Sequence, residues 1–278
     1  MKGVGDYPNW PEIPTIENEH LITDARLYAN RKSLIASLRI PRRGKIAEIG
    51  VWQGMFSAFL IEELQPRRFF AFDIFTGHEW LDWNGYTGEQ LFDGLRHREF
   101  YERAMAPFGD ITVMVEGPSA TTLRDYTDRS FDLVYVDGDH EYDAVKADAE
   151  AAVEMVSETG YLVFNDYTMI DPGNDMVYGV VPVVNELVAR GGWRVVGYAL
   201  HEHLFCDIAL CRPEHRQSLP AEEYTPVAQP AEEHPSVAPP AEQPIPQSDR
   251  PAPRLLYRAV RHPYRAARRL YHLARGHR

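Results

Sequence analysis

The sequence predicts an α/β fold with a doubly wound, mostly parallel seven-stranded sheet and a C-terminal antiparallel strand. Five short, nearly unbroken apolar runs lie between residues 45 and 165, as expected for strands that are covered on both faces. Helix-like stretches separate these runs, and such alternation is typical of parallel sheets with crossover helices. The pattern leaves open the order in which the strands pair.

The expected elements follow one another along the chain, after an N-terminal region with a helix near 23–38. Strands are predicted at 45–50, 68–74, 111–115, 131–137, 160–165, 193–199 and 203–211. Helices are predicted at 55–65, 89–106, 119–126, 140–157 and 180–190. The last two strands follow each other without a helix, which predicts a hairpin-like pair.

Composition divides the chain into four regions. Residues 1–44 are expected to form an N-terminal helical or lid region, and 45–212 the α/β domain. Residues 213–253 hold eleven of the 21 prolines and a loose repeat beginning PAE, which predicts a disordered linker. Residues 254–278 hold eight arginines and no acidic residue, which predicts a basic amphipathic tail that Pro263 kinks or splits.

The net charge of −12 is unevenly distributed along the chain. The first 212 residues carry 34 acidic against 19 basic residues, so a nucleic-acid-binding core is disfavoured. The basic tail is suited to bind an anionic membrane, an acidic partner or the acidic core itself. A fourth alternative is that it has no specific partner. These alternatives stay open, as does the oligomeric state.

The sequence also bears on the compartment. It contains no run of 18 apolar residues and no apolar segment typical of a signal peptide, so we expect a soluble cytoplasmic protein. Peripheral contact of the tail with the inner face of a membrane is compatible with this expectation. Cys206 and Cys211 are too few for a disulfide framework and are expected to pack in the core.

The ends of the first predicted strands carry residues suited to a nucleoside-bearing cofactor. Gly50 and Gly54 allow close approach of the backbone to a ligand, although their spacing is not the G-x-G-x-x-G of pyrophosphate-binding turns. Asp73 ends the second strand, where an acid can accept hydrogen bonds from ribose hydroxyls. With Glu48 they favour a cofactor without a bridging pyrophosphate. A plain glycine-rich turn and a capping aspartate are the alternatives.

Acidic and amide side chains cluster at the ends of the fourth and fifth strands. Asp137, Asp139 and His140 follow one strand, and Asn165 and Asp166 follow the next. Neighbouring parallel strands would bring Asp137 and Asp166 together, and such oxygen ligands suit Mg²⁺. The alternative is that Asp139 or His140 only caps the following helix.

Five strand-end motifs, taken in order, resemble those of class I S-adenosylmethionine (SAM) dependent methyltransferases. The closest resemblance is to small-molecule and sugar O-methyltransferases of the macrocin and rhamnosyl types, over roughly residues 25–211. It implies a Rossmann-like methyltransferase fold. The motifs are E-I-G-V-x-x-G-x-x-S from Glu48, F-D-I at Asp73, G-P-S from Gly117, Y-V-D-G-D-H at Asp137 and F-N-D-Y at Asn165.

The resemblance implies a role for each strand-end residue. The methionine part of SAM would be lined by Glu48, Gly50, Trp52 and Gly54. Asp73 would bind the ribose, the turn from Gly117 to Ser119 would contact the adenine, and Asp137 would also border the cofactor. Asp137, Asn165 and Asp166 would hold Mg²⁺. Either His140 or Asp139 would act as the base, and His140 is favoured because the ordinary pKa of imidazole is close to neutral.

The expected function is therefore Mg²⁺-assisted O-methylation of a hydroxylated small molecule, such as a sugar or a glycosylated metabolite. Aromatic loops at 75–86 and 167–178 either shape the acceptor site or only pack on the sheet. Two other functions remain open: an NAD(P)-dependent oxidoreductase, and a non-catalytic methyltransferase-like adaptor tethered by its basic tail.

Overall fold

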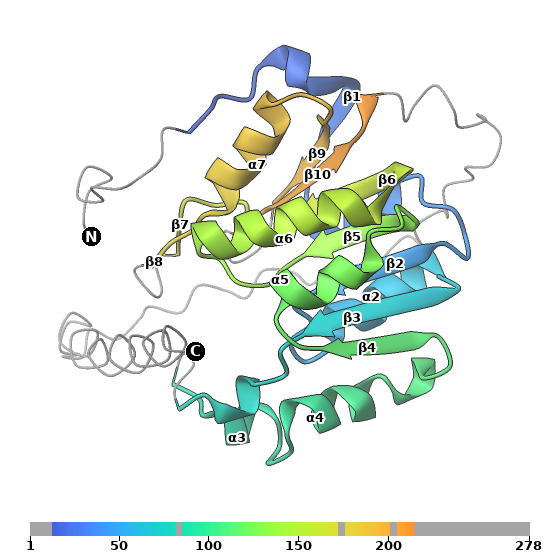
Figure 1. Cartoon of the computed structure of the whole chain (residues 1–278), viewed down its shortest axis with the longest axis vertical. Coiled ribbons are helices and arrows are strands. Elements are labelled where there is room, and N and C mark those ends of the chain that lie inside the picture. The colour runs from blue at the N-terminus through green and yellow to red at the C-terminus, as the bar shows by residue number, and fades with distance from the viewer. Residues whose placement is uncertain (1–12, 82–84, 172–175, 201–204, 214–278) are drawn as a thin grey trace, which may run out of the picture. The chain divides into compact units, whose positions relative to one another are not determined.

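A computed structural model describes residues 13–81, 85–171, 176–200 and 205–213, all within the first of two compact units of the chain, Met1–Pro226. An eight-stranded sheet runs through the described residues (Figure 1). Its strands, in chain order, are β1 (Leu21–Tyr28), β2 (Lys45–Ile49), β3 (Arg68–Asp73), β4 (Thr112–Glu116), β5 (Phe131–Val136), β6 (Val156–Phe164), β9 (Arg194–Ala199) and β10 (Asp207–Cys211).

Helices and short turns connect these strands. A two-stranded hairpin of β7 (Ile170–Asp171) and β8 (Met176–Val177) stands apart from the main sheet. The α-helices are α1 (Arg31–Ser37), α2 (Met55–Leu64), α3 (Gly88–Leu91), α4 (His97–Ala104), α5 (Ser119–Thr122), α6 (Tyr142–Met155) and α7 (Val180–Ala189). The 3₁₀ turns are η2 (Asn18–His20), η3 (Gly77–Glu79), η4 (Ala106–Phe108) and η5 (Leu123–Tyr126).

The strand order is β1-β9-β10-β6-β5-β2-β3-β4. Neighbouring strands in the run β6-β5-β2-β3-β4 pair in parallel. Strand β10 is antiparallel to both β6 and β9. The predicted doubly wound sheet with a C-terminal antiparallel strand is thus confirmed. The carboxyl ends of the parallel strands share one edge, called here the carboxyl edge, and β10 starts there because it runs the other way.

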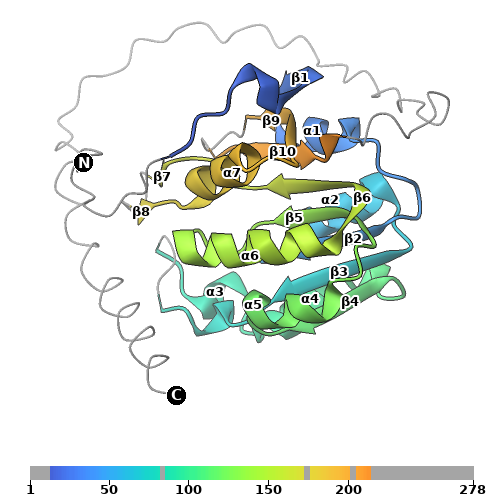
Figure 2. The ribbon, with the colours of Figure 1, turned by 45° about the horizontal axis from the view of Figure 1, so that its top comes forward.

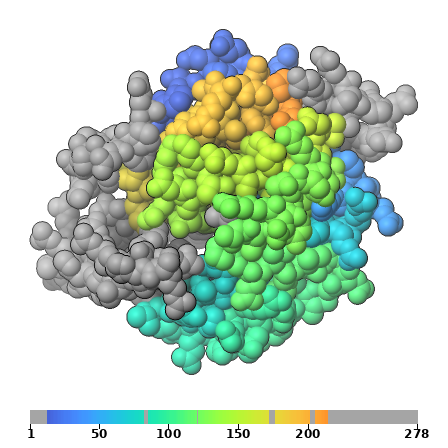
Figure 3. Space-filling view, in the orientation of Figure 1, coloured from blue at the N-terminus to red at the C-terminus, as the bar shows by residue number. Residues whose placement is uncertain are grey.

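Alternation along the strands divides the core between the two faces of the sheet. Ala47 and Ile49 of β2 pack with α6 and α7, whereas Ile46 packs with α1 and α2 on the opposite face. Figures 1 and 2 show α5, α6 and α7 on one side of the sheet and α1 and α2 on the other. Figure 3 shows that the layer of α5, α6 and α7 covers this side of the sheet.

The expected helix near 23–38 is wrong over its first half. Leu21–Tyr28 forms β1, which pairs in parallel with β9 and adds an eighth strand at the edge of the sheet. Helix α1 begins only at Arg31, after Asn30 caps it by accepting a hydrogen bond from the Ser33 amide at 2.9 Å. Pairing with a distant strand overrides the local helix preference here, so the N-terminal region is only partly helical.

Two further boundaries differ from expectation. The predicted helix 89–106 is split into α3 and α4, because Asp93 (φ 53°) and Gly94 (φ 74°) adopt left-handed backbone conformations between them. The last strand begins at Asp207, not 203, and residues 201–204 lie outside the described residues. The remaining predicted elements are present within a few residues.

The predicted tail 254–278, and the predicted linker 213–253 except Pro213, lie outside the described residues. Within the part of the chain that the structure describes, no helix combines the length and the apolar character needed to cross a bilayer.

Candidate functional site

The turn between β2 and α2 has an unusual backbone. Gly50 (φ 82°), Trp52 (φ 46°) and Gly54 (φ 85°) are all left-handed, a conformation that a tryptophan rarely adopts. A Cβ atom on Gly50 would lie 2.0 Å from the Asp137 carbonyl oxygen. Glycine is therefore required at position 50 so that the ends of β2 and β5 can touch.

Asp73 ties this turn to the loop after β3. Its Oδ2 accepts a hydrogen bond from the Val51 amide at 2.9 Å, and its Oδ1 accepts one from the Phe75 amide at 2.7 Å. Each carboxylate oxygen keeps a further acceptor position, so the residue retains the capacity to bind ribose hydroxyls. Asp73 lies at the carboxyl edge, as the sequence predicts.

Glu48 is buried at the same edge, with 1% of its surface exposed. It accepts a hydrogen bond from the Ser57 hydroxyl, which in turn accepts one from the Tyr101 hydroxyl at 3.0 Å. Burial raises the pKa of Glu48 well above its ordinary value, despite the Ser57 hydrogen bond. Its carboxyl group thus supports the start of α2 as well as bordering the turn.

His97 of α4 also fixes the glycine turn, although nothing in the sequence marks it. Its Nε2 donates to the Trp52 carbonyl at 2.7 Å, and its Nδ1 accepts from the Gly77 amide at 3.3 Å. Acceptance at Nδ1 requires the neutral imidazole, and burial lowers the His97 pKa despite the nearby Asp73. A neutral histidine therefore joins the two loops that border the predicted cofactor site.

The predicted adenine turn lies between β4 and α5. The Gly117 amide donates to the Asp73 carbonyl at 3.0 Å, which places the turn beside the Asp73 loop. Ser119 forms a side-chain hydrogen bond with Asp148 of α6, which is 2% exposed. Burial raises the Asp148 pKa to about 6.

The carboxylates of Asp137 and Asp166 lie together with the His140 imidazole at the ends of β5 and β6. One possible ligand atom from each residue lies within 4.8 Å of the other two. His140 Nε2 lies 3.0 Å from Asp166 Oδ2 and 3.8 Å from Asp137 Oδ1. The predicted meeting of Asp137 and Asp166 is thus confirmed. These donors could hold a divalent cation, with an imidazole in addition to the oxygens expected.

His140 is held firmly in this cluster. Its ring stacks on Tyr178 with centroids 4.5 Å apart and an angle of 21° between the planes. Burial lowers the His140 pKa, but Asp137, Asp166 and Asp139 outweigh burial and raise it overall. Burial and the charge of Asp137 raise the pKa of Asp166 to about 7. The surrounding carboxylates therefore make the His140 imidazole more basic than a free one.

Asp139 is placed differently from His140. It is exposed, and its Oδ1 accepts a hydrogen bond from the Glu141 amide at 3.0 Å, just before α6. This contact closes an Asx turn before α6 and is not an N-cap of the helix, because the N-cap residue is Glu141. Of the two candidate bases, only His140 belongs to the group of possible metal ligands.

Asn165 is oriented by a buried network beneath the cluster. Its amide nitrogen donates to Asp207 Oδ1 at 2.9 Å, and the Tyr135 hydroxyl donates to Asp207 Oδ2 at 2.7 Å. Asp207 is fully buried, and burial raises its pKa to about 6. The metal role of Asn165 stays a prediction.

The aromatic loops divide their side chains between packing and the site. Trp80 stacks on Trp52 with centroids 5.2 Å apart, whereas Phe75 is buried. Tyr167 donates to Asn185 Oδ1 of α7 at 2.5 Å, away from the cluster that Tyr178 covers. Residues 82–84 and 172–175 of these loops lie outside the described residues.

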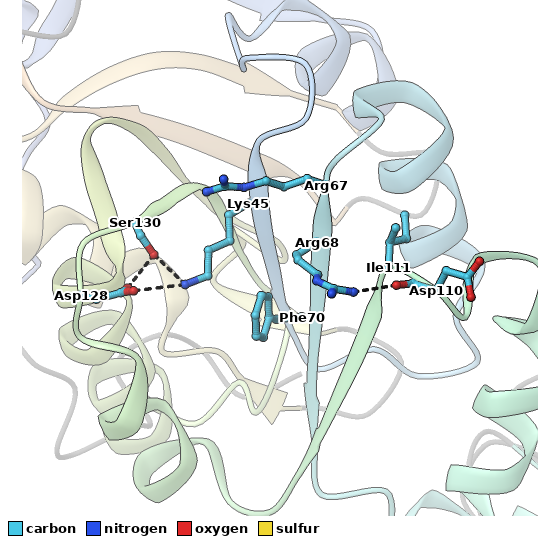
Figure 4. Close-up of a pocket in the computed structure, with 8 residues that line it drawn as sticks. All are labelled: Lys45, Arg67, Arg68, Phe70, Asp110, Ile111, Asp128 and Ser130. Atoms are coloured by element: carbon cyan, nitrogen blue, oxygen red, sulfur yellow. Dashed lines mark hydrogen bonds and ion pairs between the residues drawn. The ribbon is translucent and has the colours of Figure 1, made fainter.

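A separate cavity of about 660 Å³ lies at the opposite, amino edge of the sheet (Figure 4). Lys45 spans it, bound to Asp128 at 3.3 Å and Ser130 at 2.6 Å, and Arg68 donates to the Asp110 carbonyl. Lys45 and Asp128 thus form an ion pair with each other, and Arg68 binds a backbone carbonyl. None of the predicted site residues lines the cavity, so the carboxyl edge is the better candidate.

Comparison with known proteins supports this choice. Residues 47–167 match the family model described as a methyltransferase domain. No curated protein matches the sequence.

Solved structures resemble this chain at low sequence identity. An rRNA methylase from Streptococcus thermophilus is 11% identical with a TM-score of 0.45, over 65% of this chain and 93% of its own. A ribosomal protein L11 methylase from Lactobacillus delbrueckii subsp. bulgaricus is 14% identical with a TM-score of 0.43, over 65% and 76%. An O-methyltransferase family protein from Burkholderia thailandensis is 13% identical with a TM-score of 0.47, over 65% and 55%.

Proposed function

We propose that this chain is a SAM-dependent O-methyltransferase whose acceptor is a hydroxylated small molecule, such as a sugar or a glycosylated metabolite. The observation that carries the proposal is the cluster of Asp137, His140 and Asp166 at the carboxyl edge. It adjoins the glycine turn, since Gly50 packs directly on the backbone of Asp137. A base and a cofactor turn at one edge are what methylation of a hydroxyl requires.

The chain's own residues suit binding and orientation of the reactants. Asp73, fixed by two backbone amides, would accept the ribose hydroxyls, and the acidic edge attracts a cationic cofactor. When bound, SAM supplies an electrophilic methyl group, whose bond to sulfur breaks as the acceptor oxygen attacks. Alignment of the three reacting atoms provides much of the acceleration.

His140 would receive the proton of the acceptor hydroxyl at Nε2, the nitrogen that faces both carboxylates. Asp137 and Asp166 then stabilise the imidazolium, and the Tyr178 stack keeps the ring in place. Because Nε2 serves as the base here, the two carboxylates without the imidazole would hold Mg²⁺, which when bound would lower the pKa of the acceptor hydroxyl. A general base contributes about 10²–10⁴-fold.

Charge supports the proposed acceptor class, and the family match supports methyl transfer. The acidic balance of the first 212 residues disfavours RNA or DNA as acceptor. The match to a methyltransferase domain favours methyl transfer over the oxidoreductase alternative. The intact cluster and glycine turn argue against a non-catalytic adaptor.

The test is methyl transfer from isotope-labelled SAM to a panel of hydroxylated sugars and glycosides, with Mg²⁺ and with EDTA. We expect His140→Ala to lower kcat by about 10²–10⁴-fold and Asp137→Asn to lower it as well. Asp143→Asn, an exposed acid on α6, serves as the control. Full turnover by both site variants would contradict the mechanism, and absence of SAM binding would contradict the function.

A further inference from the structure

Arg31 brings a positive charge to an edge that is otherwise lined by acids. Strand β1 runs parallel to β9, so it ends at the carboxyl edge, and α1 begins there with Arg31. The half-buried guanidinium stacks on the Phe56 ring, 4.0 Å from its centroid. It also donates to the Tyr135 hydroxyl at 3.4 Å.

The guanidinium lies within electrostatic range of several carboxyl groups. Its positive charge lowers the pKa of Glu48 and of Asp166. The charges of Asp137 and Asp207 raise the pKa of Arg31 in turn. Yet within the described ranges the Arg31 guanidinium forms no ion pair with a carboxylate, and it donates a side-chain hydrogen bond to the Tyr135 hydroxyl. A half-buried arginine without an acidic partner is available to bind an anion.

The position of Arg31 matches one part of the cofactor. Phe56, on which it stacks, is the second residue of α2, two residues after Gly54. The glycine turn and Glu48 are the elements expected to line the methionine part of SAM, which carries a carboxylate. A carboxylate placed among Glu48 and Asp137 needs a neighbouring cation, and a guanidinium fits it with two parallel hydrogen bonds.

We propose that Arg31 binds the carboxylate of the methionine part of SAM. The inference rests on the proposed function and adds a residue from outside the matched segment 47–167. Stacking on Phe56 preorganises the guanidinium, which reduces the entropy lost when the ligand binds.

The test compares two ligands that differ in this carboxylate. S-adenosylhomocysteine carries the amino-acid part, whereas 5′-methylthioadenosine lacks it. In calorimetric titrations of the full chain, Arg31→Gln should raise the Kd of S-adenosylhomocysteine about 10- to 100-fold and leave that of methylthioadenosine unchanged. Arg31→Lys, which keeps the charge but not the planar fork, should lose less affinity.

Lys32→Gln is the matched control, because Lys32 is the next residue, is exposed, and lies over Phe59 of α2 at 5.2 Å. It should change neither affinity. Equal losses for both ligands in Arg31→Gln and Arg31→Lys would assign Arg31 a purely structural role and overturn the inference. So would unchanged affinity for S-adenosylhomocysteine with a raised KM for the acceptor. If the wild-type chain binds neither ligand, the proposed function itself fails.

Discussion

Asp148 is an acidic residue on the buried face of α6, where desolvation disfavours its charged form. It is 2% exposed on α6, and burial raises its pKa to about 6 although the Ser119 hydrogen bond favours the charged form. Between about pH 4 and 6 the folded chain holds a proton that the unfolded chain has released. Its contribution to stability therefore falls as pH rises through this window and stays low above it.

Asp148→Asn should remove this loss while its amide oxygen still accepts from Ser119. Relative to wild type, we expect the variant to gain up to about 3 kcal/mol of unfolding free energy between pH 4 and pH 8. Urea denaturation at both pH values measures the gain, with the exposed Asp143→Asn on the same helix as control. An identical difference from wild type at both pH values would show that Asp148 is not the titrating group.

For single residues, the sequence predicts the location of those that directly follow parallel strands, and of few others. Asp73, Asp137 and Asp166 could be placed because strand ends meet at one edge of a sheet. Asp207 could have been placed by the same rule, because an antiparallel last strand begins at that edge. His97 could not, since a histidine on an amphipathic helix carries no sign of the distant carbonyl that it binds.

Among the secondary-structure elements, β1 is the strand that the sequence pattern did not predict. It leads directly to Arg31 at the carboxyl edge. It approaches β9 closely at Gly197, where a Cβ atom would lie 2.6 Å from the Tyr28 ring and 2.9 Å from the Arg26 carbonyl oxygen. Local pattern could not reveal this contact because it joins residues far apart in the chain. By contrast, β2 to β6 were predictable from apolar runs that need no partner to be recognised.

Gly197→Ala should push β1 away from β9 and displace Arg31 with it. We expect a loss of about 1–3 kcal/mol of stability and weaker binding of S-adenosylhomocysteine, measured by thermal denaturation and calorimetry. Gly109→Ala is the control, since its added Cβ would meet only the Ala106 carbonyl oxygen at an ordinary 3.5 Å. Faster hydrogen exchange of residues 21–28 in Gly197→Ala alone would locate the damage; equal effects of both substitutions would contradict the argument.

At the scale of the whole molecule, charge separates the described core from the C-terminal segment. All described strands end by Cys211, whereas the eight arginines of 254–278 follow the proline-rich segment 213–253. Composition alone predicts these two C-terminal segments, because it needs no knowledge of packing. It could not say whether the arginines bind an anionic surface, or which one.

Removal of residues 214–278 should leave the melting temperature and the binding of S-adenosylhomocysteine unchanged. Binding to vesicles that contain anionic lipid should fall, and the difference should shrink at high salt because surface attraction is screened. Co-sedimentation of the full and shortened chains with anionic and with neutral vesicles measures this. Equal sedimentation of both chains would rule out the membrane as the partner of the arginines.

The stacked pair of Trp52 and Trp80 gives the molecule a built-in optical reporter. Two indoles 5.2 Å apart at 28° couple their excited states, and one of them lies in the left-handed turn between Gly50 and Gly54. A small rotation of that turn changes the coupling and therefore the near-ultraviolet circular dichroism. Ligand binding at the turn can thus be followed by spectroscopy in the unlabelled chain.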